Sequence, residues 1–238
     1  MSSTCSSSRP SLEQATDDFQ TFVLRQEFPC LGARAAVNNA SYSLGVYDDL
    51  ASERSTAALA QDLSTFTRSD AFRANEYATF IAVFSPLEGS DELEFERLMW
   101  EQLGALNEVD AASFRWDASV RSDPSDPKFS FSFAGQALYV IGLHPNSSRI
   151  ARRFRWPAMI FNPHRQFERL RAEGQWNRMR QTIRERDLRL QGSVNPMLSD
   201  FGEASEARQY SGRAVEENWR PPFVPAKTAV HERCPFAH

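Results

Sequence analysis

Apolar side chains recur at helical spacing in four stretches of the chain, and this period predicts amphipathic helices. The first stretch covers residues 11–27 and begins at Ser11, a residue type that caps helix N-termini well. The same period predicts helices over residues 51–74, 90–106 and about 165–190. The last of these is long and highly charged, so we expect a helix that is largely exposed to solvent.

Shorter runs predict strands, because they are continuously apolar or alternate between apolar and polar residues. These runs are residues 41–47, 77–84, 129–133, 137–143 and 158–161. Gly135 and Gln136 separate the third run from the fourth, which is typical of a β-hairpin.

Helices and strands mix without strict alternation, and several adjacent strands look hairpin-linked. This order favours an α+β fold in a single domain, with a mainly antiparallel sheet flanked by helices. We expect a disordered, serine-rich tail over residues 1–10 and one domain over residues 11–238. From residue 192 onward, five prolines predict an irregular C-terminal tail.

Composition narrows the class of protein. With 41% hydrophobic residues, a chain of 238 residues can bury a large core. The 27 basic and 31 acidic side chains give a net charge of -4, so neither nucleic acid nor a membrane is an expected partner. The three cysteines lack the spacing of a disulfide framework, which favours the reducing cytoplasm.

Two histidines stand directly after predicted strands and beside prolines. His144 follows the run 137–143 and precedes Pro145, whereas His164 follows Pro163. A neutral imidazole at the end of a strand can ligate a metal or haem iron. The alternative is that both histidines are polar turn residues.

A cluster of arginines lies between the two histidines. Ser147 and Ser148 are good N-cap residues, and the segment after them carries Arg149, Arg152 and Arg153. Guanidinium groups at this place can pair with haem propionates or with a substrate carboxylate. The alternative is a solvated face of a helix.

Motif searches are informative mainly by exclusion. The chain has no GxGxxG, GxxxxGK[ST], HExxH or GxSxG motif and no paired CxxC. His231, Cys234 and His238 have metal-ligand side chains but no second half-site. A tail that packs Phe236 into the core is the alternative for that segment.

Five motifs, in order along the chain, make this sequence resemble the YqcI/YcgG family. They are FPC at 28–30, LHPNSSRIARRF at 143–154, PAMIFNPHRQFERLR at 157–171, SEARQYSGR at 205–213 and CPFAH at 234–238. The resemblance runs from about residue 19 over nearly the whole chain. Members with assigned roles are haem-dependent oxygenases that hydroxylate guanidine nitrogen, and many members have no assigned role.

The resemblance implies a haem b cofactor and an oxygenase that hydroxylates a nitrogen of a guanidine- or amine-containing small molecule. An arginine-like substrate is favoured. Dioxygen would be the co-substrate, and an external electron donor or a separate reductase would supply electrons, because the chain has no flavin or nicotinamide motif.

Roles for individual residues follow from this resemblance as hypotheses. We assign His144 as the axial ligand of the iron and Arg149, Arg152 and Arg153 as partners of the propionates. His164 is the second choice for the axial ligand, or a group on the opposite side of the haem.

The motif at 205–213 supplies the candidate substrate-binding residues Glu206, Arg208, Tyr210 and Arg213. The acid can pair with a guanidinium group and an arginine with a carboxylate. The alternative is a salt-bridged surface turn.

Two other functions remain open. The protein can be a haem-binding or haem-sensing protein without turnover, or a haem-free protein that binds an anionic metabolite.

Overall fold

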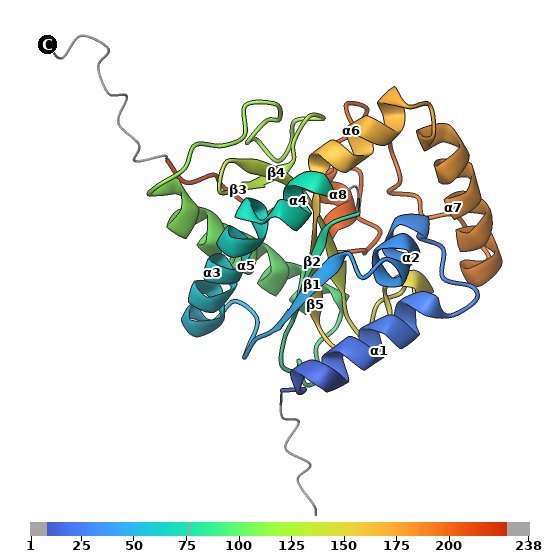
Figure 1. Ribbon diagram of the computed structural model, residues 1–238, viewed down its shortest axis with the longest axis horizontal. Helices are drawn as coiled ribbons and strands as arrows, with labels where there is room; N and C mark the ends of the chain where they lie inside the picture. Colours follow the sequence, from blue (N-terminus) through green and yellow to red (C-terminus); the bar gives the residue numbers. More distant parts are fainter. Residues whose placement is uncertain (1–8, 76, 228–238) are drawn as a thin grey trace, which may run out of the picture.

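A five-stranded sheet runs through the centre of the protein, in a computed structural model that describes residues 9–75 and 77–227 (Figure 1). Its strands are β1 (Tyr42–Val46), β2 (Thr79–Val83), β3 (Phe131–Phe133), β4 (Gln136–Leu143) and β5 (Ala158–Pro163). The spatial order is β1-β2-β5-β4-β3. Only β1 and β2 are parallel, so the predicted α+β fold with a mainly antiparallel sheet is confirmed.

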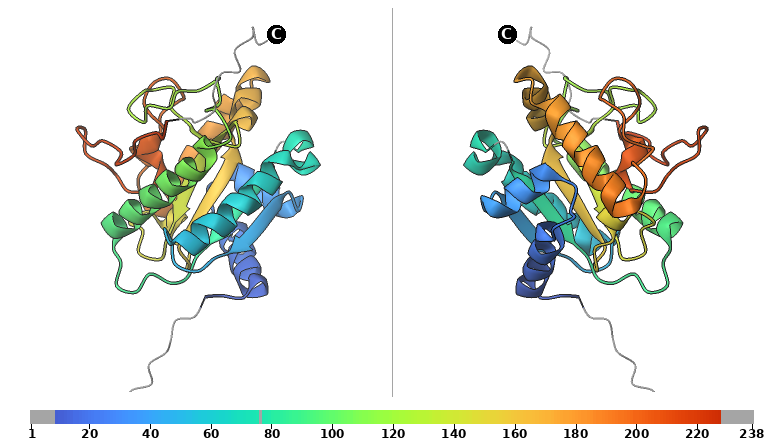
Figure 2. Two further views of the ribbon diagram at one scale, coloured as in Figure 1. Left: turned by 90° about the vertical axis from the view of Figure 1, so that its left-hand side faces the viewer. Right: turned by 90° about the vertical axis from the view of Figure 1, so that its right-hand side faces the viewer.

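Helices cover both faces of this sheet. They are α1 (Leu12–Leu24), α2 (Leu31–Asn38), α3 (Glu53–Arg68), α4 (Asp70–Ala74), α5 (Glu92–Ala111), α6 (His164–Ala172), α7 (Trp176–Gln191) and α8 (Ala207–Tyr210). Helices α3 and α5 lie on one face, whereas α1, α2 and α7 lie on the other, as Figure 1 and the two side views of Figure 2 show.

Side chains alternate between these two faces along each strand. On the face of α3 and α5, Val140 and Phe161 join a large core that also contains Trp100. On the opposite face, Ile81 and Ile160 belong to a smaller core with the aromatic side chains of α1. Each fully buried side chain of this size contributes roughly 1.5–3 kcal/mol by leaving water.

The predicted hairpin between β3 and β4 is confirmed. Ala134 and Gly135 turn the chain, and both have positive φ, at 51° and 69°. The buried carboxylate of Asp110 accepts a hydrogen bond from the Ala134 N–H at 2.8 Å, which stabilises this turn from α5.

Two predicted helices are each divided in the structure. The segment 51–74 breaks at Ser69, whose backbone is extended and whose hydroxyl accepts a hydrogen bond from the Phe72 N–H at 3.0 Å. The segment 165–190 breaks before α7 at Gly174, where φ is 71°. A residue in the left-handed region ends an α-helix.

The N-cap residues Ser147 and Ser148 are followed only by a short 3-10 helix, η1 (Ile150–Arg152), so the alternative of a solvated helix face for the arginines is wrong. The physical reason is tertiary bonding. The Arg152 carbonyl accepts a hydrogen bond from the His144 N–H at 3.1 Å, and the Arg149 side chain pairs with Asp187 of α7. The chain therefore follows its partners in β4 and α7 rather than a helical path.

Helix α2, by contrast, forms in a segment too rich in small residues to be predicted as a helix.

Residues 1–8 and 228–238 lie outside the described residues, so most of the expected disordered tail and the motif at 234–238 are not part of this description. Within residues 9–75 and 77–227, no helix combines the length and the apolar character needed to cross a bilayer.

Gly142 of β4 provides a test of this packing. A Cβ atom there would lie 2.7 Å from Phe95 Cε1 and 3.0 Å from the Tyr210 carbonyl oxygen. Because the carbonyl belongs to the backbone, Gly142→Ala should lower the free energy of unfolding by about 1–3 kcal/mol. Gly104→Ala, in open space on α5, should raise it by up to about 1 kcal/mol. Urea unfolding measures both free energies. A free energy of unfolding for Gly142→Ala equal to that of wild type would contradict the packing described.

Candidate functional site

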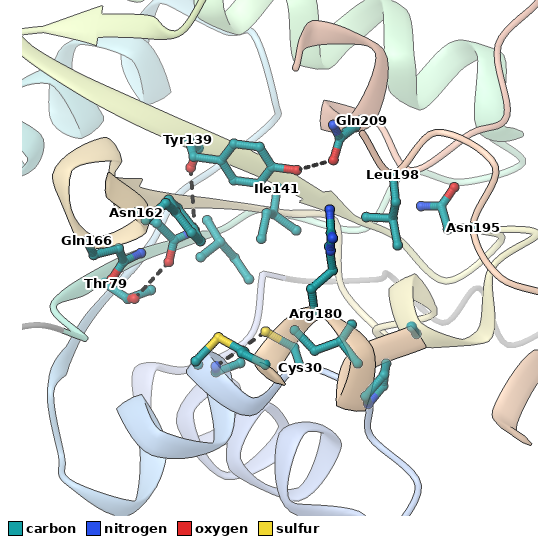
Figure 3. Close-up of a pocket in the computed structure, with 18 of the residues that line it drawn as sticks. Cys30, Thr79, Tyr139, Ile141, Asn162, Gln166, Arg180, Asn195, Leu198 and Gln209 are labelled. Carbon is teal, nitrogen blue, oxygen red and sulfur yellow. Dashed lines mark hydrogen bonds between the residues drawn. The ribbon is translucent and has the colours of Figure 1, made fainter. Parts of the chain in front are cut away.

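A pocket of about 260 Å³ lies on the face of the sheet that bears α1, α2 and α7 (Figure 3). Its floor is made of side chains from β2, β4 and β5, among them Ile81, Ile141 and Ile160. Helix α7 covers the pocket, which its apolar side chains Trp176, Met179 and Ile183 line. None of these three is fully buried, whereas Asp187 of the same helix is. The apolar face of α7 therefore borders a cavity rather than a packed core.

His164 is the first residue of α6 and follows β5 directly, so the strand end positions its ring in this pocket. The side chain is 3% exposed, and neither ring nitrogen has a hydrogen-bond partner among the described residues. Burial, reinforced by the charge of Arg171, lowers the pKa of His164 to about 4. At neutral pH it is a neutral imidazole with nitrogens available to a ligand.

Two carboxyl groups lie near this ring, since Glu168 Oε1 is 3.8 Å from Nε2 and Glu206 Oε2 is 3.6 Å from Nδ1. The other carboxyl oxygen of Glu206 accepts a hydrogen bond of 2.6 Å from the Tyr210 hydroxyl. That hydroxyl also accepts a bond from the Phe131 N–H at 3.1 Å. Burial raises the pKa of Glu206 to about 8, so the carboxyl group is mostly protonated at neutral pH.

A connected set of polar side chains crosses the floor of the pocket (Figure 3). The Thr79 hydroxyl donates to the side-chain oxygen Oδ1 of Asn162 at 2.9 Å, and the side-chain amide of Asn162 donates to the backbone carbonyl of Tyr139 at 3.4 Å. The Tyr139 hydroxyl donates to Gln209 at 2.8 Å. These groups give an otherwise apolar pocket a few directional hydrogen-bonding sites.

Cys30 also lines the pocket, at the N-terminus of α2. Its sulfur accepts a hydrogen bond from the Ala33 N–H at 3.5 Å. Burial raises the pKa of the thiol, so at neutral pH it is protonated and a weak metal ligand. Among residues 9–75 and 77–227, no three His, Cys, Asp or Glu side chains gather as ligands of a metal ion.

Five arginines line the pocket: Arg149, Arg152, Arg171, Arg180 and Arg184. Arg149 pairs with Asp187 and Arg180 with Asp200. Within the described part of the chain, the other three have no carboxylate at ion-pair distance. Because Glu206 is mostly uncharged, the pocket carries a surplus of positive charge.

His144 does not line this pocket. Strands β4 and β5 are antiparallel, so the histidines that follow them lie at opposite ends of the sheet. The His144 ring stacks on Phe95 of α5, with ring centres 4.5 Å apart and an angle of 20° between the planes. It is 1% exposed, and burial lowers its pKa to about 4.

The predicted arginines of the 143–154 motif are separated by the structure. Arg149 lines the pocket but is neutralised by Asp187. Arg152 also lines it and donates to the carbonyls of Gly142, Gln209 and Tyr210. Arg153 points elsewhere, because its Nε donates to the Ser147 carbonyl at 2.6 Å.

Of the predicted substrate-binding residues, Glu206 alone lines the pocket. Arg208 donates to backbone carbonyls of the segment 215–217, and Arg213 pairs with Glu96 of α5. Tyr210 is fully buried and stacks on Trp100, in the core on the other face of the sheet.

Sequence reasoning missed the three arginines that α6 and α7 contribute to the pocket: Arg171, Arg180 and Arg184. A signal for Arg184 was present. On a helical projection, Arg180 and Arg184 fall within the apolar stripe of Trp176, Met179 and Ile183. In an ordinary amphipathic surface helix, charged residues lie on the opposite face. Charges inside an apolar stripe indicate that this face of the helix does not pack entirely against an apolar core.

Comparison with known proteins finds a match over most of the chain. The sequence model of the YqcI/YcgG family matches residues 19–224, a span that includes His164 and Glu206. A protein of Bacillus subtilis (strain 168), called uncharacterized protein YcgG, is 24% identical over 218 residues, which cover 89% of this chain and 81% of that protein. No solved structure matches.

The Glu206–His164 pair predicts how stability depends on pH. From pH 6.5 to 8, Glu206 binds a proton in the folded state alone, whereas His164 binds one only in the unfolded state and loses it as the pH rises above about 6.5. The contribution of Glu206 to the free energy of unfolding should therefore fall as pH rises through this window, by at most about 1.4 kcal/mol per pH unit. Below pH 4.5 this contribution is fully present.

Urea unfolding of the ligand-free protein at several pH values measures this slope. Glu206→Gln keeps the acceptor for Tyr210 but cannot ionise, so it should flatten the profile between pH 6.5 and 8. Glu108→Gln, on the exposed side of α5, is the matched control and should leave it unchanged. An equal slope in wild type and Glu206→Gln would show that Glu206 ionises normally.

Proposed function

The chain belongs to the YqcI/YcgG family, and from this premise we propose that it is a haem-dependent oxygenase that hydroxylates a nitrogen of a guanidine- or amine-containing small molecule. An arginine-like substrate is favoured by the resemblance. The reaction would take place in the pocket between the sheet and α7, with dioxygen as co-substrate and electrons from a separate donor. We propose a cytoplasmic location, in keeping with the cysteine pattern.

The observation that carries this proposal is the pair of unpartnered nitrogens on His164. A buried polar atom without a hydrogen bond is costly, so such an atom that borders a cavity is a strong candidate for ligand contact. Neutral imidazole is also the form that binds iron. His144 is likewise neutral, and its Nδ1 also has no hydrogen-bond partner among the described residues, but it does not border the pocket. Its position in the pocket therefore favours His164 over His144 as the ligand of the iron.

The surroundings fit a haem group. The walls are mainly apolar and aromatic, which suits a macrocycle, and arginines without carboxylate partners can receive its acidic side chains. Haem bound through a single histidine supplies the activation of dioxygen. The protein's part is to hold the group, to keep water away from it and to orient the substrate.

Glu206 and Tyr210 act on the ring of His164. A carboxyl oxygen 3.6 Å from Nδ1 needs only a small movement to form a hydrogen bond, which would fix the orientation of the ring. Tyr210 keeps Glu206 in place through its bond of 2.6 Å. Glu206 and Tyr210 therefore position the imidazole of His164, the proposed ligand of the iron, without contacting the substrate.

The polar floor suits the substrate. A guanidine or amine donates hydrogen bonds, and Asn162 Oδ1 and the hydroxyls of Thr79 and Tyr139 can accept them. Asn162 is two residues from His164 on the same strand end, so a substrate bound there lies close to the proposed haem.

Absorption spectra of the protein as isolated, after reconstitution with haem, after reduction with dithionite and with carbon monoxide test the proposal. We expect a Soret band with stoichiometric haem. His164→Ala should lose it because the axial nitrogen is gone, and added imidazole should restore it. His144→Ala, the matched control, should retain it. No haem in wild type after reconstitution would refute the function, and a wild-type spectrum in His164→Ala would refute the ligand.

A further inference from the structure

Arg171 and Arg184 face the pocket with charges that no carboxylate of the described residues compensates. Removing a guanidinium group from water is unfavourable unless an anion or several hydrogen bonds replace the water. Two such groups in the wall of one cavity need a common explanation.

Arg184 is the clearer case. Its Nε is buried and has no hydrogen-bond partner among the described residues. The acid one turn further along α7, Asp187, is already used, since it pairs with Arg149 and accepts a hydrogen bond from the Asn195 N–H at 2.9 Å. Asp187 is close to Arg184 in the sequence, but its ion pair is with Arg149.

Arg171 reaches the pocket from α6. The centre of its guanidinium group lies 4.9 Å from the Trp176 ring and 5.9 Å from the Phe201 ring. Contact with aromatic rings uses the flat face of the group and leaves the N–H edge available for a bidentate bond to a carboxylate. The Phe201 ring also lies 4.5 Å from the His164 ring, so Arg171 lies at the same end of the pocket as His164.

Arg152 differs from both. Its two terminal nitrogens donate to three backbone carbonyls, which join β4 and α8. These bonds satisfy the group internally, so Arg152 has a structural role at the edge of the pocket.

We infer that Arg171 and Arg184 form the carboxylate-binding site of this pocket. The carboxylates come either from the propionate side chains of haem or from the substrate. The identity of the ligand rests on the proposed function, whereas the binding chemistry rests on the two guanidinium groups alone.

Arg171→Met and Arg184→Met test the inference, because methionine retains a long unbranched side chain and lacks the guanidinium charge. Arg178→Met is the matched control, since Arg178 is exposed on α7 and does not line the pocket. Circular dichroism checks the fold. Arg184→Met in particular should fold, because no hydrogen bond of the described chain is lost.

The first measurement is the affinity for iron protoporphyrin IX and for its dimethyl ester, which lacks both carboxylates. If propionates bind here, wild type should prefer the free acid roughly tenfold or more, and each variant should lose most of this preference while binding the ester unchanged. If the substrate supplies the carboxylate, the variants should bind haem normally but bind arginine roughly tenfold more weakly, with agmatine, its decarboxylated analogue, unaffected.

Unchanged affinities for both haem and arginine in both variants would overturn the inference. If wild type binds no haem, the proposed function fails but the site can still be tested. Benzoate should then raise the melting temperature of wild type and of Arg178→Met but not of the two pocket variants, with neutral benzamide as the reference. Equal effects of benzoate on all four proteins would overturn the inference independently.

Discussion

The alternation of side chains along β2, β4 and β5 is the constraint on which the rest of the structure depends. One set of side chains points toward α3 and α5 and packs into a continuous aromatic core. The other set points toward α1, α2 and α7, where the helices leave a cavity. The same strands therefore stabilise the fold with one face and form a ligand site with the other.

The cost of this arrangement is concentrated in the pocket. His164 has unpartnered nitrogens, Glu206 is protonated by burial, and Arg184 has a charge without an anion. Each feature lowers stability in the empty protein, and a ligand with a metal centre and carboxylate groups would relieve the first and the last. The large core on the other face stabilises the fold enough to tolerate them.

The sequence predicts the fold better than the site. Period and turn residues predict the sheet and the β3–β4 hairpin, because these signals are local. The choice between His144 and His164 is not local, since both follow a strand and stand beside a proline. Only the antiparallel pairing of β4 with β5 separates them. Likewise, the sequence does not show that Asp187 pairs with Arg149, which is distant in the chain, rather than with Arg184, which is one helical turn away.

The central claim is that the ligand of this protein binds between the sheet and α7, on His164. A crystal structure of the protein after reconstitution with haem tests it most directly. The account predicts a porphyrin in the pocket, with its iron bonded to a ring nitrogen of His164. Iron bonded to His144, or a porphyrin outside the pocket, would contradict it.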